Sequence, residues 1–73
     1  MPHPIVAELV GNVLTVVAQE GSAVAVGDTI VILESMKMEI PVLTEVAGTV
    51  RDIAVQAGEV VQEGDVLAVV DPA

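Results

Sequence analysis

The residue of this chain best suited to chemistry is Lys37, the sole lysine among 73 residues, which stands between two methionines, Met36 and Met38. A lysine amine can be acylated or can form a Schiff base, provided that its surroundings remove its proton. The titratable neighbours Glu34 and Glu39 form no base–nucleophile pair with Lys37, because a carboxylate stabilises the ammonium. We therefore expect covalent chemistry at Lys37 to depend on another protein that activates the amine.

Composition excludes most other kinds of site. The chain has no cysteine, which excludes disulfides and thiolate metal sites. Its one histidine, His3, lies at an N-terminus that we expect to be frayed, which disfavours a histidine-based metal site or catalytic triad. Eleven acidic residues against Lys37 and Arg51 give a net charge of −9, which disfavours nucleic acids and anionic membranes as partners. The longest apolar runs, such as 30–33, are too short to cross a bilayer, and the N-terminus lacks the features of a secretion signal. We expect a cytoplasmic protein.

The composition of the chain predicts that Lys37 is held by an all-β fold. Seventeen valines and five isoleucines are β-branched residues that pack well on pleated sheets, and six glycines divide the chain into segments too short for ordinary helices. At this length the chain forms one domain, spanning 1–73. Alternating and continuous apolar stretches predict eight short strands, at 4–9, 12–17, 23–26, 29–35, 38–43, 48–54, 59–62 and 66–71.

The chain repeats itself with an offset of 37 residues. Ten of the 36 aligned pairs are identical, and the half-repeats 1–36 and 38–73 leave Lys37 as the unpaired centre. Neither half can bury its own apolar face, so we expect the halves to pack together about a pseudo-two-fold axis. Six glycines coincide in pairs, and we expect them to mark turns that need a positive φ, with the aspartate of each Gly-Asp pair bonding the local backbone.

Lys37 lies between two predicted strands, 29–35 and 38–43, and must therefore occupy a tight connection, most simply a hairpin tip. Its ammonium would project into water. Two methionines at such a tip either close the end of the core or offer an exposed apolar surface to a partner.

The segment Glu34-Ser35-Met36-Lys37-Met38-Glu39 resembles the biotin attachment motif of biotinyl domains, in the family of biotinyl and lipoyl attachment domains. The resemblance covers nearly the whole chain, including the repeat, the Gly-Asp turns and the stretch 47–50. It implies a flattened barrel-sandwich of two four-stranded antiparallel sheets with Lys37 on the exposed turn.

The same resemblance implies a carrier function. A biotin–protein ligase would use ATP to join biotin to Lys37 through an amide, and the tethered biotin would carry CO2 between a biotin carboxylase and a carboxyltransferase. The chain itself would be a monomeric carrier without catalytic residues. Met36 and Met38 correspond to the flanking methionines that the ligase recognises, and Glu34 and Glu39 flank the hairpin.

Two departures from the family pattern stand out. Ser35 occupies a position where many members have alanine, and the link 18–21 is too short to hold the loop that in some members folds over the biotin, so we expect a mobile biotin. Three alternatives remain: a lipoyl domain, although lipoyl domains usually have aspartate rather than a methionine before the lysine; an interaction module whose lysine is never modified; and an enzyme using Lys37 for Schiff-base chemistry, which would need a desolvating pocket.

Overall fold

The computed structural model describes all residues from 1 to 73 and contains eight β-strands. The strands are β1 (His3–Val6), β2 (Gly11–Val16), β3 (Ala23–Val24), β4 (Thr29–Ser35), β5 (Met38–Leu43), β6 (Gly48–Ile53), β7 (Val60–Val61) and β8 (Val66–Pro72). None of its segments is a helix able to cross a membrane. The all-β prediction is confirmed.

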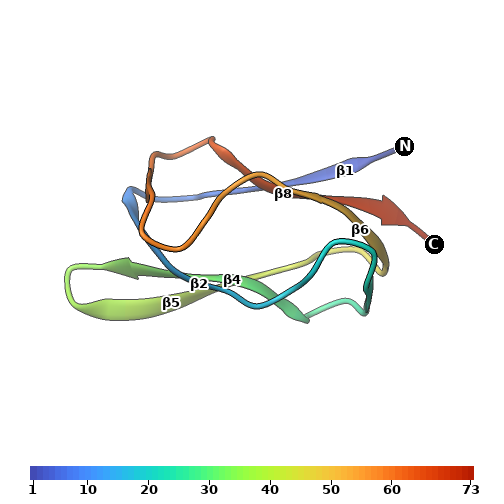
Figure 1. Cartoon of the computed structure of the whole chain (residues 1–73), viewed down its shortest axis with the longest axis horizontal. Coiled ribbons are helices and arrows are strands. Elements are labelled where there is room, and N and C mark those ends of the chain that lie inside the picture. The colour runs from blue at the N-terminus through green and yellow to red at the C-terminus, as the bar shows by residue number, and fades with distance from the viewer.

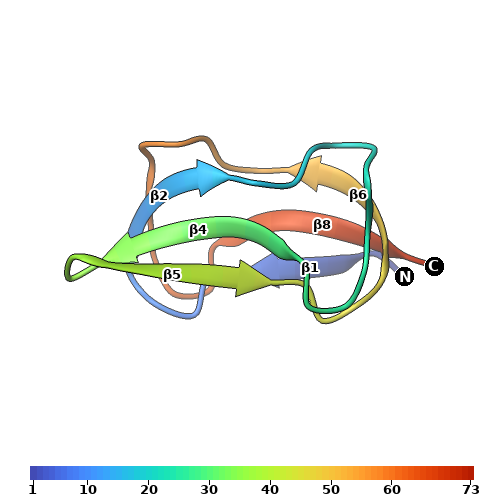
Figure 2. The same ribbon diagram turned by 90° about the horizontal axis from the view of Figure 1, so that it is seen from below.

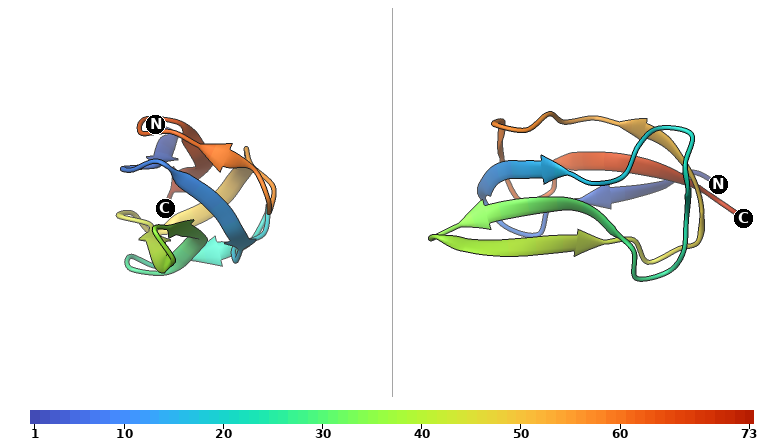
Figure 3. Two further views of the ribbon diagram at one scale, coloured as in Figure 1. Left: turned by 90° about the vertical axis from the view of Figure 1, so that its left-hand side faces the viewer. Right: turned by 60° about the horizontal axis from the view of Figure 1, so that its bottom comes forward.

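The strands form two four-stranded antiparallel sheets, ordered β1-β8-β6-β3 and β5-β4-β2-β7. Figure 1 shows the sheets as two layers along the long axis of a body measuring 35 × 17 × 17 Å. Seen end-on in the left view of Figure 3, they wrap around a narrow interior. Valine, isoleucine, leucine and alanine fill this interior, which suits a core with no aromatic ring.

The sequence repeat is also a structural repeat. Adding 37 to the bounds of β2, β3 and β4 gives those of β6, β7 and β8, and the same shift converts the strand order of one sheet into that of the other. Even the irregularities correspond, since the β2–β4 register shifts between Val13 and Thr15 and the β6–β8 register between Val50 and Asp52. The predicted pseudo-two-fold architecture is confirmed.

The Gly-Asp turns work as predicted. Gly27 and Gly64 have φ values of 91° and 92°, a backbone conformation that residues with a side chain rarely adopt. In each turn the aspartate accepts a hydrogen bond from a backbone N–H three residues earlier: Asp28 from Ala25 and Asp65 from Gln62, both at 2.9 Å. These turns lead into β4 and β8, the long strands that line the core.

Two glycines are conserved between the halves for a different reason from the one predicted. Gly11 and Gly48 do not have a positive φ; instead another strand approaches their Cα closely. A Cβ on Gly48 would collide with the carbonyl oxygen of Asp71, and one on Gly11 would lie 2.7 Å from that of Glu34. The missing side chain is therefore what permits close contact between paired strands.

Several predicted strands were too long or placed too far along the chain. The first ends at Val6, where its register with β8 shifts. The third is only Ala23–Val24, because the N–H of Ala25 donates to the side chain of Asp28. His3, expected in a frayed start, pairs with Val70 as the first residue of β1.

Candidate modification site at the β4–β5 hairpin

Lys37 lies in a two-residue hairpin loop, as predicted. Strands β4 and β5 pair in register up to Ser35 and Met38, which leaves only Met36 and Lys37 between them. Both loop residues have a positive φ, 52° and 65°, the signature of a type I′ turn. The tip projects from the end of the molecule opposite both termini (Figure 1).

The backbone of this loop is strained. Type I′ turns favour Asn-Gly because both central residues must be left-handed, and any other L-residue there costs about 1–2 kcal/mol. Met36 and Lys37 adopt this conformation because the pairing of β4 with β5 extends without interruption from Ser35 to Val31 and leaves no other way to close the hairpin. Strain of this kind tends to collect at functional sites.

Replacing Met36 by asparagine should relieve part of this strain. Asparagine tolerates a positive φ, so we expect Met36→Asn to raise the free energy of unfolding by about 0.5–1 kcal/mol. Chemical denaturation of the unmodified protein measures the change. The β-branched replacement Met36→Val is the matched comparison and should be destabilising; equal stability of the two variants would contradict a strained turn.

The amine of Lys37 is accessible and makes no ion pair. The side chain is exposed, and the salt bridge of the chain joins the other basic residue, Arg51, to Asp71 at 3.6 Å. Neither of the two surface pockets is lined by Lys37. The structure therefore presents one unengaged side-chain amine at the hairpin tip.

The flanking methionines are exposed apolar residues. Met36 is 88% exposed and Met38 58%, and neither belongs to the core cluster. They do not close the end of the core, which was one of the two interpretations of the sequence. The two side chains offer a partner apolar surface to bury beside Lys37, which was the other interpretation.

Glu34 and Glu39 face each other directly across β4 and β5. Like charges in this position repel and weaken the hairpin slightly. The two carboxylates are thus placed beside the tip, Glu34 half-buried and Glu39 exposed. Ser35, the departure from the family pattern, is half-buried opposite Met38.

The link 18–21 lies at the wrong end to reach Lys37. Strand β2 begins near the tip, where Asn12 pairs with Glu34, and ends far from it, where Val16 pairs with Val31. The segment that follows β2 is therefore close to the termini (Figure 3, right). The link beside the hairpin is 7–10, between β1 and β2, and it is also short.

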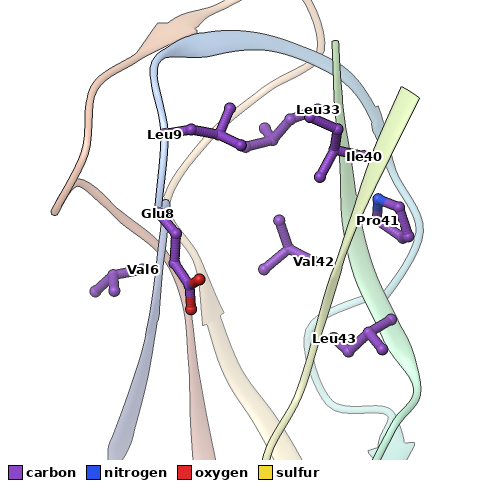
Figure 4. Close-up of a pocket in the computed structure, with 8 residues that line it drawn as sticks. All are labelled: Val6, Glu8, Leu9, Leu33, Ile40, Pro41, Val42 and Leu43. Atoms are coloured by element: carbon purple, nitrogen blue, oxygen red, sulfur yellow. The ribbon is translucent and has the colours of Figure 1, made fainter. Parts of the chain in front are cut away.

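A groove that sequence reasoning missed lies below the tip. Strands β1 and β5 are edge strands of different sheets and do not pair, and a space of about 240 Å³ opens between β5 and the link 7–10 that follows β1; Figure 2 shows the two strands in the whole molecule. Figure 4 shows Leu9 and Leu33 pointing toward each other across it, with Val42 and the Glu8 carboxylate nearby. No sequence signal predicts that β5 and the link 7–10 border the same space.

The sequence and the fold of this chain are similar to those of known proteins. The family model Biotin_lipoyl, described as biotin-requiring enzyme, matches residues 1–70. A single-chain, multi-domain long-chain acyl-CoA carboxylase contains a similar fold, with a TM-score of 0.92 and 33% identity over 99% of this chain and 7% of that protein. Kluyveromyces lactis urea carboxylase gives 0.93 and 32%, over 97% of this chain and 6% of that one. The lipoyl domain of the 2-oxoglutarate dehydrogenase complex from Azotobacter vinelandii gives 0.72 and 29%, over 88% and 82%.

Curated relatives are also small proteins named for biotin. The biotinylated protein TB7.3 homolog of Mycolicibacterium smegmatis is 55% identical over 40 residues, and the biotinylated protein TB7.3 of Mycobacterium tuberculosis is 54% identical over a stretch of the same length. Each match spans 55% of this chain and 56% of the relative, so the aligned region is about half of either protein.

Proposed function

Because the chain belongs to the family of biotin-requiring enzymes, we propose that Lys37 is the residue to which biotin is covalently attached. The observation that carries the proposal is the setting of the amine. The only lysine of the chain is exposed, lies outside any ion pair and occupies a two-residue turn at the end of the body opposite the termini.

Attachment is an acyl transfer catalysed by a biotin–protein ligase. ATP first activates the biotin carboxyl group as a mixed anhydride with AMP, releasing pyrophosphate. Nζ of Lys37 then forms an amide bond with the carboxyl carbon, loses a proton and displaces AMP. Deprotonation falls to the ligase, because no general base of this chain is hydrogen-bonded to Lys37. The net charge changes from −9 to −10, because one positive charge is lost.

The hairpin supports selection of Lys37 by position. The two-residue turn sets the position of the Lys37 backbone at the end of the hairpin, so the ligase meets a lysine side chain that always starts from the same point. Met36 and Met38 add exposed apolar surface on either side of the amine, where the ligase can bury it.

The body suits a carrier. Biotin, once attached, supplies a ureido nitrogen that can hold CO2, and the partners would be a biotin carboxylase and a carboxyltransferase. The 35 Å long body keeps the tip at the end opposite both termini, so an attachment through either terminus would leave the tip free. A tethered group reaches its two active sites at high effective concentration.

Biotin is favoured over lipoate as the attached group because Met36 precedes the lysine and because the curated relatives are named as biotinylated.

The proposal is tested by labelling the purified protein. Incubation with a biotin–protein ligase, biotin and Mg-ATP should give quantitative retention by streptavidin, and omission of ATP should prevent it. A folded protein that remains unlabelled under conditions that label a known biotin acceptor would contradict the proposal.

The negative charge of the body should speed its encounter with a ligase that offers a basic surface. Opposite charges raise association rates, and salt screens them, so we expect kcat/KM for labelling to fall about 3- to 10-fold between about 0.01 and 0.15 M salt. Glu39→Gln, beside the tip, should lower the value at low salt more than Glu45→Gln, which removes one charge from the turn at the opposite end. Labelling that is insensitive to salt would rule out electrostatic docking.

A further inference from the structure

We propose that the groove between β5 and the link 7–10 is an intramolecular resting site for the ring of a biotinyl group carried by Lys37. The inference rests on the proposed function and adds a second contact to it. The chain has no long loop to cover the tip, which led to the expectation of a mobile biotin. The groove gives the ring a place on the body itself.

The groove lies within reach of Lys37. Its nearest wall residue on β5 is Ile40, three residues along the strand and therefore about 10 Å from Lys37. A biotinylated lysine side chain has about eleven bonds between Cα and the ring, one of them the planar amide bond, and these span about 14 Å when extended. The ring can therefore lie against Ile40 without any movement of the hairpin.

The groove also matches the ring in size and polarity. Its volume of about 240 Å³ suits a small bicyclic system better than a larger ligand. Leu9, Leu33 and Val42 supply an apolar lining for the thioether ring (Figure 4). The Glu8 carboxylate borders the same space, accepts no hydrogen bond from the chain, and can accept bonds from the ureido N–H groups.

The pseudo-two-fold copy of the groove is not hollowed. At the end that holds the termini, Ile5 takes the place of Val42 and Val46 that of Leu9, and no pocket forms there. Ile5 is only 4% exposed, whereas Val42 is half-buried. The repeat alone therefore does not account for the groove, which occurs only at the end bearing the lysine.

Methyl NMR spectra of the unmodified and the biotinylated protein test the inference. We expect biotinylation to shift the methyl signals of Leu9, Ile40 and Val42, and to leave those of Ile5 and Val46 unchanged as internal controls. Shifts confined to residues 35–39, or shifts of equal size at the control methyls, would overturn it. Shifts that fade on dilution would assign the groove to the ring of a second copy and would also overturn it.

Two variants test the polar contact. Glu8→Ala should reduce the shift changes at Ile40 and Val42 about threefold or more, because it removes a charged acceptor, and should speed capture by streptavidin. Glu45→Ala, at the two-fold equivalent position, should do neither. Equal behaviour of the two variants would overturn the inference.

The result is separable from the proposed function. Intact mass reports whether the ligase has labelled Lys37, independently of where the ring lies. If no ligase labels the chain, the same amide can be made with an active ester of biotin, after the N-terminal amine is blocked, because Lys37 is the sole lysine. The NMR comparison then tests the groove even when the biological proposal has failed.

Discussion

Lys37→Arg leaves the domain folded and abolishes its labelling by a biotin–protein ligase. The side chain is exposed and outside any ion pair, so the fold loses nothing when it changes, and arginine keeps the charge. A guanidinium, however, stays protonated and does not act as the acyl acceptor. Circular dichroism melts should match those of the wild type, while streptavidin binding after the ligase reaction should fall to background.

Exchanging Met36 and Lys37 tests whether the ligase selects the lysine by its position in the turn or by the composition of the segment. The double variant Met36→Lys with Lys37→Met keeps the same residues and net charge, and both positions have a positive φ, so the backbone need not change. We expect this variant to be labelled poorly, because the lysine side chain then starts at the first residue of the turn and points in a different direction. Efficient labelling would contradict selection by geometry.

Gly48→Ala should cost about 3 kcal/mol or more of stability, because the added Cβ collides with the carbonyl oxygen of Asp71. The strands β6 and β8 must separate to make room, and their pairing holds one sheet together. In a domain whose total stability is on the order of 4–11 kcal/mol, this corresponds to a fall of about 12 °C or more in Tm. Thermal and denaturant unfolding measure it.

Gly58→Ala is the matched control for this substitution. Gly58 has a φ of 96° but open space around it, so its methyl group meets only backbone strain, about 1–2 kcal/mol. The expected order is therefore a larger loss for Gly48→Ala than for Gly58→Ala. The reverse order would show that the glycines are kept for their φ values, as the sequence alone suggested.

Much of the fold follows from local patterns in the sequence. The β-branched composition, the glycine spacing and the offset of 37 residues predict eight strands in two equivalent halves, and strands β4 and β5 occur at the predicted residues. The position of Lys37 follows as well, because the segment between two such strands can only be a tight turn. These features depend on neighbours in the chain, which the sequence displays directly.

Other features depend on contacts between distant segments. The positive φ of Met36 and Lys37 goes against the preferences of both residues and is imposed by the strand pairing on either side. The need for glycine at Gly48 arises from Asp71, 23 positions along the chain. Likewise, the groove arises where β5 passes beside the link 7–10, and the sequence gives no sign of that contact.

The two ends of the symmetric body differ in the way the chain is connected. The two-fold equivalents of Met38 and Met36 are Met1 and Ala73, so the hairpin tip at one end corresponds to residues 1 and 73 at the other. Closing the chain at one end creates the turn that presents Lys37.

Intact mass spectrometry of the protein isolated from cells that contain a biotin–protein ligase tests the central claim most directly. We expect the mass to increase by that of one biotinyl group, and fragmentation to place the addition on Lys37. A chain that carries a lipoyl group instead, or that stays unmodified while other acceptors in the same cells are biotinylated, would contradict the account.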